Sequence, residues 1–238
     1  MLLLQWPNCY HTPKIPLEQI ISRVTGYFLS AQACRNRVTK RKIMRKLHDK
    51  YFKQAKREGK LARSVYKLEE LDRKDKLLRR GDRVLDIGAS PGSWLEYILA
   101  TIGPEGVACA VDLKVIHKKF KGRAHFKKMD AHDLTPETFA DVVPDGFNVI
   151  VSDMAPNTSG IRIVDQTRSL ELCEFVFGLA EKLLRKNGNF ACKMFYGPDT
   201  ETFKKSLAPR FREVKTRKPD ACRDESIEIY VIGLGFTG

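Results

Sequence analysis

Acidic side chains recur at the ends of predicted strands in this chain. Asp112 ends the apolar stretch VACAVD, Asp130 follows a stretch near Ala124–Met129, and Asp153 ends FNVIVSD. The carboxyl ends of parallel strands meet at one edge of a sheet, and doubly wound sheets bind their ligands there. The sequence therefore predicts three carboxylates around one crevice.

A glycine-rich turn, GASPG from Gly88 to Gly92, follows the first predicted strand. Glycine lets the backbone approach a ligand closely. Asp112 lies about 20 residues further on, where a carboxylate can accept both hydroxyls of a ribose. Together they favour a nucleoside-containing cofactor. The turn lacks both the GxGxxG spacing of dinucleotide sites and the Lys-Ser/Thr of a P-loop, which favours S-adenosylmethionine over NAD.

One lysine stands in an otherwise apolar strand. Lys193 is flanked by FAC and MF, and burying a lysine in such a strand is costly unless it is paired. At the ligand-binding edge of the sheet it would face Asp153. Glu228 begins the last predicted strand and would bring a second acid to the same edge. The alternative is a lysine at the sheet margin whose side chain reaches solvent.

The elements that must position these residues alternate between strands and helices. Strands are predicted over Arg83–Gly88, Val107–Leu113, Ala124–Met129, Phe147–Met154, Asn189–Phe195, Arg212–Arg217 and Glu228–Leu234. Helices are predicted over Leu95–Thr101 and Arg168–Lys186, the second stopped by Asn187–Gly188. This alternation favours an α/β fold with a mostly parallel sheet and helices on both faces. No helix-length segment separates the last two strands, so they are expected to be antiparallel.

Positive charge is concentrated in one segment of the 238-residue chain. The net charge is +14, and residues 35–80 hold 19 basic and 6 acidic side chains. We interpret this segment as two helices, one from about Lys42 to Gly59 and one over residues 61–78. A neutral body with a basic arm predicts a nucleic acid as partner. A solvated helix face that aids solubility is the alternative.

Other features limit the class of protein. The longest apolar runs, such as Val149–Val151, are far shorter than a membrane-spanning helix. Six scattered cysteines lack zinc-ligand spacing, which indicates a reducing, intracellular compartment and no metal site. Residues 1–41 are interpreted as a poorly ordered extension or a start placed too early, with organelle targeting as the alternative.

Five stretches of the chain together carry a family resemblance. They are ARSVYKLEEL (62–71), DIGASPGSW (86–94), SDMAPNTSG (152–160), CKMF (192–195) and RKPDACRDESIEIYVIGLGF (217–236). From about His48 to Phe236 the chain resembles the FtsJ family of ribosomal RNA 2′-O-methyltransferases. The resemblance implies a Rossmann-like S-adenosylmethionine-dependent methyltransferase fold, with seven strands and an antiparallel last strand. Ser93 is a departure, because the family usually has glycine there.

The resemblance also implies the residues of the site. A catalytic Lys-Asp-Lys-Glu tetrad falls on Lys67, Asp153, Lys193 and Glu228. The positions that bind S-adenosylmethionine fall on Gly88, Gly92, Trp94, Asp112, Asp130 and Asp153. Asp112 is expected to hold the ribose and Asp130 the adenine amino group. Lys193 is predicted to be the general base, or to orient the hydroxyl while it stays charged.

The basic segment and the resemblance together predict an enzyme that methylates a ribose 2′-hydroxyl of RNA. The resemblance implies that the target is a uridine in the aminoacyl-site loop of large-subunit ribosomal RNA. The competing functions are a tRNA 2′-O-methyltransferase and a catalytically silent RNA-binding assembly factor. A NAD-dependent oxidoreductase is the weakest alternative, because the glycine fingerprint is missing.

The predicted organisation has three parts. They are an extension over residues 1–41, a basic helical RNA-binding arm over 42–80 and a methyltransferase domain over 81–238. The expected partner is the large ribosomal subunit, with no membrane attachment and a monomeric enzyme. A cytoplasmic location is expected, with the mitochondrial matrix as the alternative.

Overall fold

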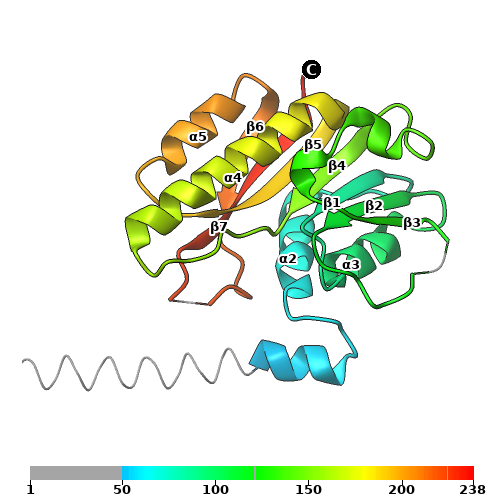
Figure 1. Cartoon of the computed structure of the whole chain (residues 1–238), viewed down its shortest axis with the longest axis horizontal. Helices are drawn as coiled ribbons and strands as arrows, with labels where there is room; N and C mark the ends of the chain where they lie inside the picture. The colour runs from blue at the N-terminus through cyan, green and yellow to red at the C-terminus, as the bar shows by residue number, and fades with distance from the viewer. Residues whose placement is uncertain (1–49, 121, 224) are drawn as a thin grey trace, which may run out of the picture. The chain divides into compact units, whose positions relative to one another are not determined.

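The structure is a computed structural model that describes residues 50–238, apart from residues 121 and 224. The strands within this range are β1 (Arg83–Ile87), β2 (Val107–Asp112), β3 (Ala124–Lys128), β4 (Phe147–Ser152), β5 (Leu184–Phe195), β6 (Phe211–Arg217) and β7 (Glu228–Phe236). They form one sheet in the order β3-β2-β1-β4-β5-β7-β6 (Figure 1). All seven predicted strands are confirmed, with bounds that shift by a few residues.

The sheet is parallel from β3 to β5 and antiparallel at its last strand. Strand β7 pairs with β5 on one side and with β6 on the other, antiparallel to both. The predicted antiparallel final pair is therefore confirmed. Glu228, which begins β7, pairs with Phe195, which ends β5. The start of the last strand thus lies at the sheet edge where the parallel strands end.

Helices cover both faces of the sheet, as predicted. Along β1, Leu85 and Ile87 pack in one core with α4 (Arg162–Leu183) and α5 (Thr200–Leu207). Val84 packs in a second core with α2 (Val65–Asp75) and α3 (Ser93–Ile102). Because the central strands bury both faces, their sequences are apolar runs rather than alternating patterns.

The junction between α4 and β5 differs from the prediction. Helix α4 ends at Leu183 and β5 begins at the next residue, so Asn187–Gly188 lies inside the strand and is not the helix stop. Asn187 has a φ of +66°, and a Cβ on Gly188 would lie 2.9 Å from the carbonyl oxygen of Asn148. The pair forms an irregularity within the strand, a place that favours the same residue types as a helix end.

Helix α5 and two short 3-10 segments, η1 (Ala131–Asp133) and η2 (Pro136–Phe139), were not predicted. Elements this short show too few turns for a periodic pattern. Helix α4 also begins at Arg162, earlier than the predicted Arg168.

The described part of the basic segment contains two helices joined by a turn. Residues 50–57 form a helix that ends before Gly59, whose φ is +67°. In α2, Leu68 and Leu71 are fully buried, whereas Leu61 of the predicted apolar stripe is 37% exposed. The described residues belong to one compact unit. The predictions for residues 1–41 lie outside the described residues.

An ion pair fastens α2 to the edge of the sheet. The Asp75 side chain at the end of α2 is fully buried, and Arg217 at the end of β6 donates two hydrogen bonds to it, at 2.7 and 2.9 Å. Lys215 lies 3.5 Å from the same carboxylate. The helix that carries Lys67 is therefore tied to strands made much later in the chain.

Two surveys cover only the residues that the structure describes. Among them, no helix is both long and apolar enough to cross a membrane. In the same residues, no group of three or more His, Cys, Asp or Glu side chains could hold a metal ion.

Candidate active site

Four charged side chains from separate parts of the chain meet at the carboxyl-terminal edge of β4 and β5. The ammonium nitrogen of Lys193 lies 3.1 Å from Oδ1 of Asp153, which follows β4. Lys67 of α2 lies 3.7 Å from the same oxygen and also pairs with Glu228. All four side chains are at least four-fifths buried. The structure thus brings together the four residues predicted as a tetrad, which we call the ionic cluster.

Opposite charges keep two members of the ionic cluster ionised. Burial alone would lower the pKa of Lys67, but the carboxylates of Asp153 and Glu228 raise it above its ordinary value. Burial would raise the pKa of Glu228, but Lys67 and Lys193 hold it below the usual range. Lys67 therefore stays a cation and Glu228 an anion at neutral pH.

A buried tyrosine joins the two carboxylates of the cluster. The Tyr230 hydroxyl donates to Asp153 and also lies 2.9 Å from Oε1 of Glu228. Burial, together with these carboxylates, raises the pKa of this phenol well above its ordinary value. Tyr230 was not predicted as a site residue, because an aromatic residue in an apolar strand is usually a core residue.

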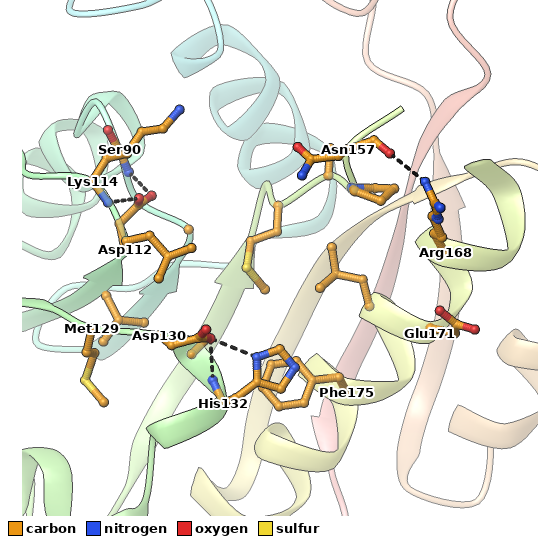
Figure 2. A pocket seen from close by; sticks show the side chains of 18 of the residues that line it. Ser90, Asp112, Lys114, Met129, Asp130, His132, Asn157, Arg168, Glu171 and Phe175 are labelled. Carbon is orange, nitrogen blue, oxygen red and sulfur yellow. Dashed lines mark hydrogen bonds and ion pairs between the residues drawn. The ribbon is translucent and has the colours of Figure 1, made fainter. Parts of the chain in front are cut away.

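A cavity of about 770 Å³ lies beside the ionic cluster (Figure 2). Met154, Ala155 and Pro156, which directly follow Asp153, line it. So do Gly88, Ser90, Pro91, Val111, Asp112, Leu113, Lys114, Met129, Asp130, Ala131, His132, Asn157, Arg168, Glu171, Leu172 and Phe175. The predicted crevice at the ends of β2, β3 and β4 is therefore present, but only two of the three expected carboxylates, Asp112 and Asp130, line it.

The carboxylate of Asp112 is held in place by the backbone. One oxygen accepts the amide N–H of Ser90 at 2.8 Å, and the other accepts that of Lys114 at 2.7 Å (Figure 2). These contacts hold the carboxylate at the wall of the cavity. Each oxygen retains acceptor capacity for a hydroxyl.

Asp130 takes part in a second fixed group. Its Oδ1 accepts the backbone N–H of His132 at 3.0 Å and lies 2.8 Å from the Nδ1 of that ring. Hydrogen bonding by His132 lowers the pKa of the Asp130 carboxyl below its usual range. The His132 ring stacks on Phe175 of α4, with centroids 4.1 Å apart. Neither ring was predicted, because the contact joins elements far apart in sequence.

The predicted cofactor positions divide into two groups. Gly88, Asp112 and Asp130 line the cavity, whereas Gly92, Trp94 and Asp153 are not among its lining residues. Trp94 is only 2% exposed, and its indole N–H donates to the carbonyl of Ser64 at 2.8 Å. The side chain of Trp94 therefore packs α3 against the residue before α2.

Steric crowding explains why the turn after β1 has glycine at position 88. Its φ is +82°, and a Cβ there would lie 2.3 Å from Cγ of Met154. Only glycine lets the turn after β1 and the segment after β4 approach this closely. The two segments form adjoining walls of the cavity.

Asp86 is an unusual buried acid beneath this turn. It is 1% exposed, and neither carboxyl oxygen has a hydrogen-bond partner among the residues that the structure describes. Burial, followed by the charges of Asp153 and Asp112, raises its pKa well above the ordinary value. Asp86 is therefore uncharged over a pH range in which a surface aspartate is ionised.

The lining residues fit S-adenosylmethionine. Asp112 offers acceptors for a ribose diol, and Asp130 offers an acceptor for an amino group. Leu113, Met129 and Phe175 supply apolar surface for the faces of a purine.

Comparisons with known proteins agree with this geometry. A family model described as FtsJ-like methyltransferase matches residues 61–236. The chain is 43% identical over 189 residues to the ribosomal RNA large subunit methyltransferase E of Bdellovibrio bacteriovorus, covering 78% of this chain and 95% of that protein. The protein of the same name from Methanobrevibacter smithii is 38% identical over 198 residues, covering 81% of this chain and 92% of that one.

A solved structure is also similar. The crystal structure of a Plasmodium falciparum protein described as a ribosomal RNA methyltransferase superposes with a TM-score of 0.65 at 28% identity. The match covers 74% of this chain and 98% of the other. With its seven-stranded sheet and its ionic cluster beside the cavity, the chain belongs to the FtsJ-like methyltransferase family.

Proposed function

We propose that this protein transfers a methyl group from S-adenosylmethionine to a ribose 2′-hydroxyl of large-subunit ribosomal RNA. The ionic cluster beside a cavity with two fixed carboxylates carries the proposal. The names of the bacterial and archaeal relatives support the class of RNA. Asp112 would hold the ribose of the cofactor and Asp130 its adenine amino group, with Gly88, Gly92, Trp94 and Asp153 completing the site.

The chain's own residues must prepare a weak nucleophile. Bound S-adenosylmethionine supplies a methyl group that its sulfonium already activates. The protein must align the 2′-oxygen with it, and such alignment can contribute about 7–11 kcal/mol to lowering the barrier. Lys193 approaches the hydroxyl and either accepts its proton or orients its lone pair. Lys67 is held as a cation by two carboxylates, so it fixes Asp153 and Glu228 rather than acting as the base.

The decisive experiment measures tritiated methyl transfer to three acceptors. These are undermethylated large ribosomal subunits, protein-free ribosomal RNA and tRNA. We expect incorporation into ribosomal RNA, and we expect Lys193→Ala to lower kcat by about 10²–10⁴-fold, the usual contribution of acid–base catalysis. The variant should bind S-adenosylmethionine with an unchanged Kd.

Lys205→Ala is a matched control, because Lys205 is an exposed lysine on α5 outside the cluster. It should retain wild-type kcat. Incorporation into tRNA alone would replace the proposed substrate. Near-normal turnover by Lys193→Ala would remove Lys193 from the mechanism, and cofactor binding without transfer to any acceptor would favour a silent assembly factor.

The finer parts of the proposal concern the target and the setting. The target is a uridine of the aminoacyl-site loop, which nucleotide mapping of the tritiated product would test. The enzyme works as a monomer, since one chain supplies all four cluster residues, and sedimentation would test this. It acts in the cytoplasm without membrane attachment, where bacterial ribosomal subunits assemble, and cell fractionation would distinguish this from a mitochondrial location.

A further inference from the structure

An exposed aromatic ring lies at the edge of the sheet that carries the ionic cluster. Tyr196 directly follows Phe195, which ends β5 and pairs with Glu228. Its amide N–H donates to the carbonyl of Ile227 at 2.7 Å, so the chain is still paired with the segment before β7. Tyr196 is thus three residues beyond Lys193, directly after the strand that carries this lysine and at the same edge of the sheet.

The backbone around Tyr196 is fixed by buried polar side chains. Gln166 of α4 donates to the carbonyl of Tyr196 at 2.6 Å. Ser169 accepts the N–H of Phe195, and Thr200 accepts that of Gly197, both at 2.9 Å. Gln166, Ser169 and Thr200 are each at most 9% exposed. The fold therefore holds this position rigidly from both sides.

Despite this support, more than half of the Tyr196 surface is exposed. The residue is 55% exposed, and in the described part of the chain its ring stacks on no other ring and its hydroxyl has no hydrogen-bond partner. Ile161, which directly precedes α4, and Ile163, in its first turn, are 59% and 56% exposed. That turn follows the segment after β4, so it belongs to the same edge. A largely exposed ring on a hydrogen-bonded backbone, at the edge that carries the ionic cluster, is suited to receive a flat partner.

We propose that Tyr196 stacks on a nucleobase of the substrate RNA, either that of the methylated nucleotide or of its immediate neighbour. This inference rests on the proposed function, because a ribose that reaches Lys193 carries its base on the adjacent carbon of the same ring. Bases in single-stranded loops are commonly recognised by stacking on tyrosine, and the protein backbone must be rigid for the ring to position the ribose. Tyr196 is a positioning residue for the substrate and takes no part in proton transfer.

The first test compares Tyr196→Leu with Tyr196→Phe. Leucine keeps apolar bulk without a π face, and phenylalanine keeps the ring without the hydroxyl. We expect kcat/KM for RNA to fall about tenfold in Tyr196→Leu and to stay within about twofold of wild type in Tyr196→Phe. The Kd for S-adenosylmethionine should not change in either. Val115→Ala removes exposed apolar surface elsewhere and should have no effect.

The second test removes the base instead of the ring. RNA substrates carry an abasic ribose at the mapped nucleotide, or at the nucleotide on either side. At one of these positions the base and the ring should be coupled, so that Tyr196→Leu causes no further loss once the base is absent. Additive losses at all three positions would overturn the proposal, as would equal losses in the Leu and Phe variants.

A binding measurement separates this proposal from the proposed function. RNA oligonucleotides with 2-aminopurine near the target report stacking by fluorescence quenching without any turnover. Quenching by wild type but not by Tyr196→Leu supports stacking even if no methyl transfer is observed. Equal quenching by both proteins, or no RNA binding by wild type, would refute it.

Discussion

At the scale of single residues, the difference between the two lysines of the cluster lies in their partners. Lys67 contacts two carboxylates, which raise its pKa despite burial. Lys193 pairs with Asp153 and with the backbone carbonyl of the same residue. Two carboxylates hold the proton on Lys67, so Lys193 is the better candidate for the base.

Asp86 gives a prediction about pH. Its pKa is raised in the folded state, so between the unfolded value of about 4 and the folded value the native protein binds more protons than the unfolded chain. The stabilising contribution of protonated Asp86 is therefore complete at low pH and is lost as the pH rises from the unfolded pKa through the folded pKa. We expect Asp86→Asn to gain stability relative to wild type between pH 5 and pH 8, by about 1 kcal/mol or more.

Urea unfolding of both proteins across this range measures the effect. Asp82→Asn is a useful comparison. Burial also raises the pKa of Asp82, but its carboxylate accepts a hydrogen bond from the N–H of Arg79. Its pH dependence should be weaker than that of Asp86→Asn. Parallel stability curves for wild type and Asp86→Asn would contradict the prediction.

At the scale of elements, sequence patterns located the strands better than the short helices. Strands that bury both faces give apolar runs, and their ends at Asp112, Asp130 and Asp153 predicted the crevice. The resemblance alone identified Lys67, because a lysine in a basic helix looks like a solvated surface residue. The stack of His132 on Phe175 and the hydrogen bonds of Tyr230 depend on tertiary contacts, so no local pattern indicates them.

The tie between α2 and β6 yields a second prediction. Asp75→Asn removes the charge that Arg217 and Lys215 compensate and leaves Arg217 with a weaker acceptor. We expect a loss of about 2–3 kcal/mol in the free energy of unfolding at pH 7. Burial alone would raise the pKa of Asp75, but Arg217 and Lys215 lower it below its ordinary value in the folded state. The carboxylate therefore stabilises above the unfolded pKa, and the difference should shrink as pH falls below about 4.

Glu213→Gln provides the control for this experiment. Glu213 pairs with Lys215 at 2.9 Å on the exposed side of β6. Loss of an exposed pair costs about 1 kcal/mol or less. If Asp75→Asn costs no more than Glu213→Gln, the contact does not anchor α2.

At the scale of the whole molecule, we propose that RNA binds to the basic helix and that the cofactor binds separately, in the cavity. In the helix of residues 50–57, Lys50, Lys56 and Arg57 are exposed. Reversing all three to glutamate should weaken RNA binding and reduce its salt dependence by roughly one unit of log–log slope per lost phosphate contact. The Kd for S-adenosylmethionine should stay unchanged.

Filter binding over a salt series and calorimetry with the cofactor measure the two effects. Lys205→Glu, on α5, is the single-charge control and should leave the salt slope unaltered. A folded triple variant that loses cofactor affinity would refute this separation. Unchanged RNA affinity would refute the RNA-binding role predicted for the arm.

The position of β7 has a consequence for the order of events during synthesis. Strand β6 is translated before β7, but it has no neighbouring strand to pair with until β7 inserts between it and β5. The same insertion delivers Glu228 to lysines translated long before it. A nascent chain that ends before β7 therefore lacks the last two strands of the assembled sheet and the Glu228 of the ionic cluster. Catalytic competence should appear abruptly, only after the ribosome has finished the segment up to Phe236.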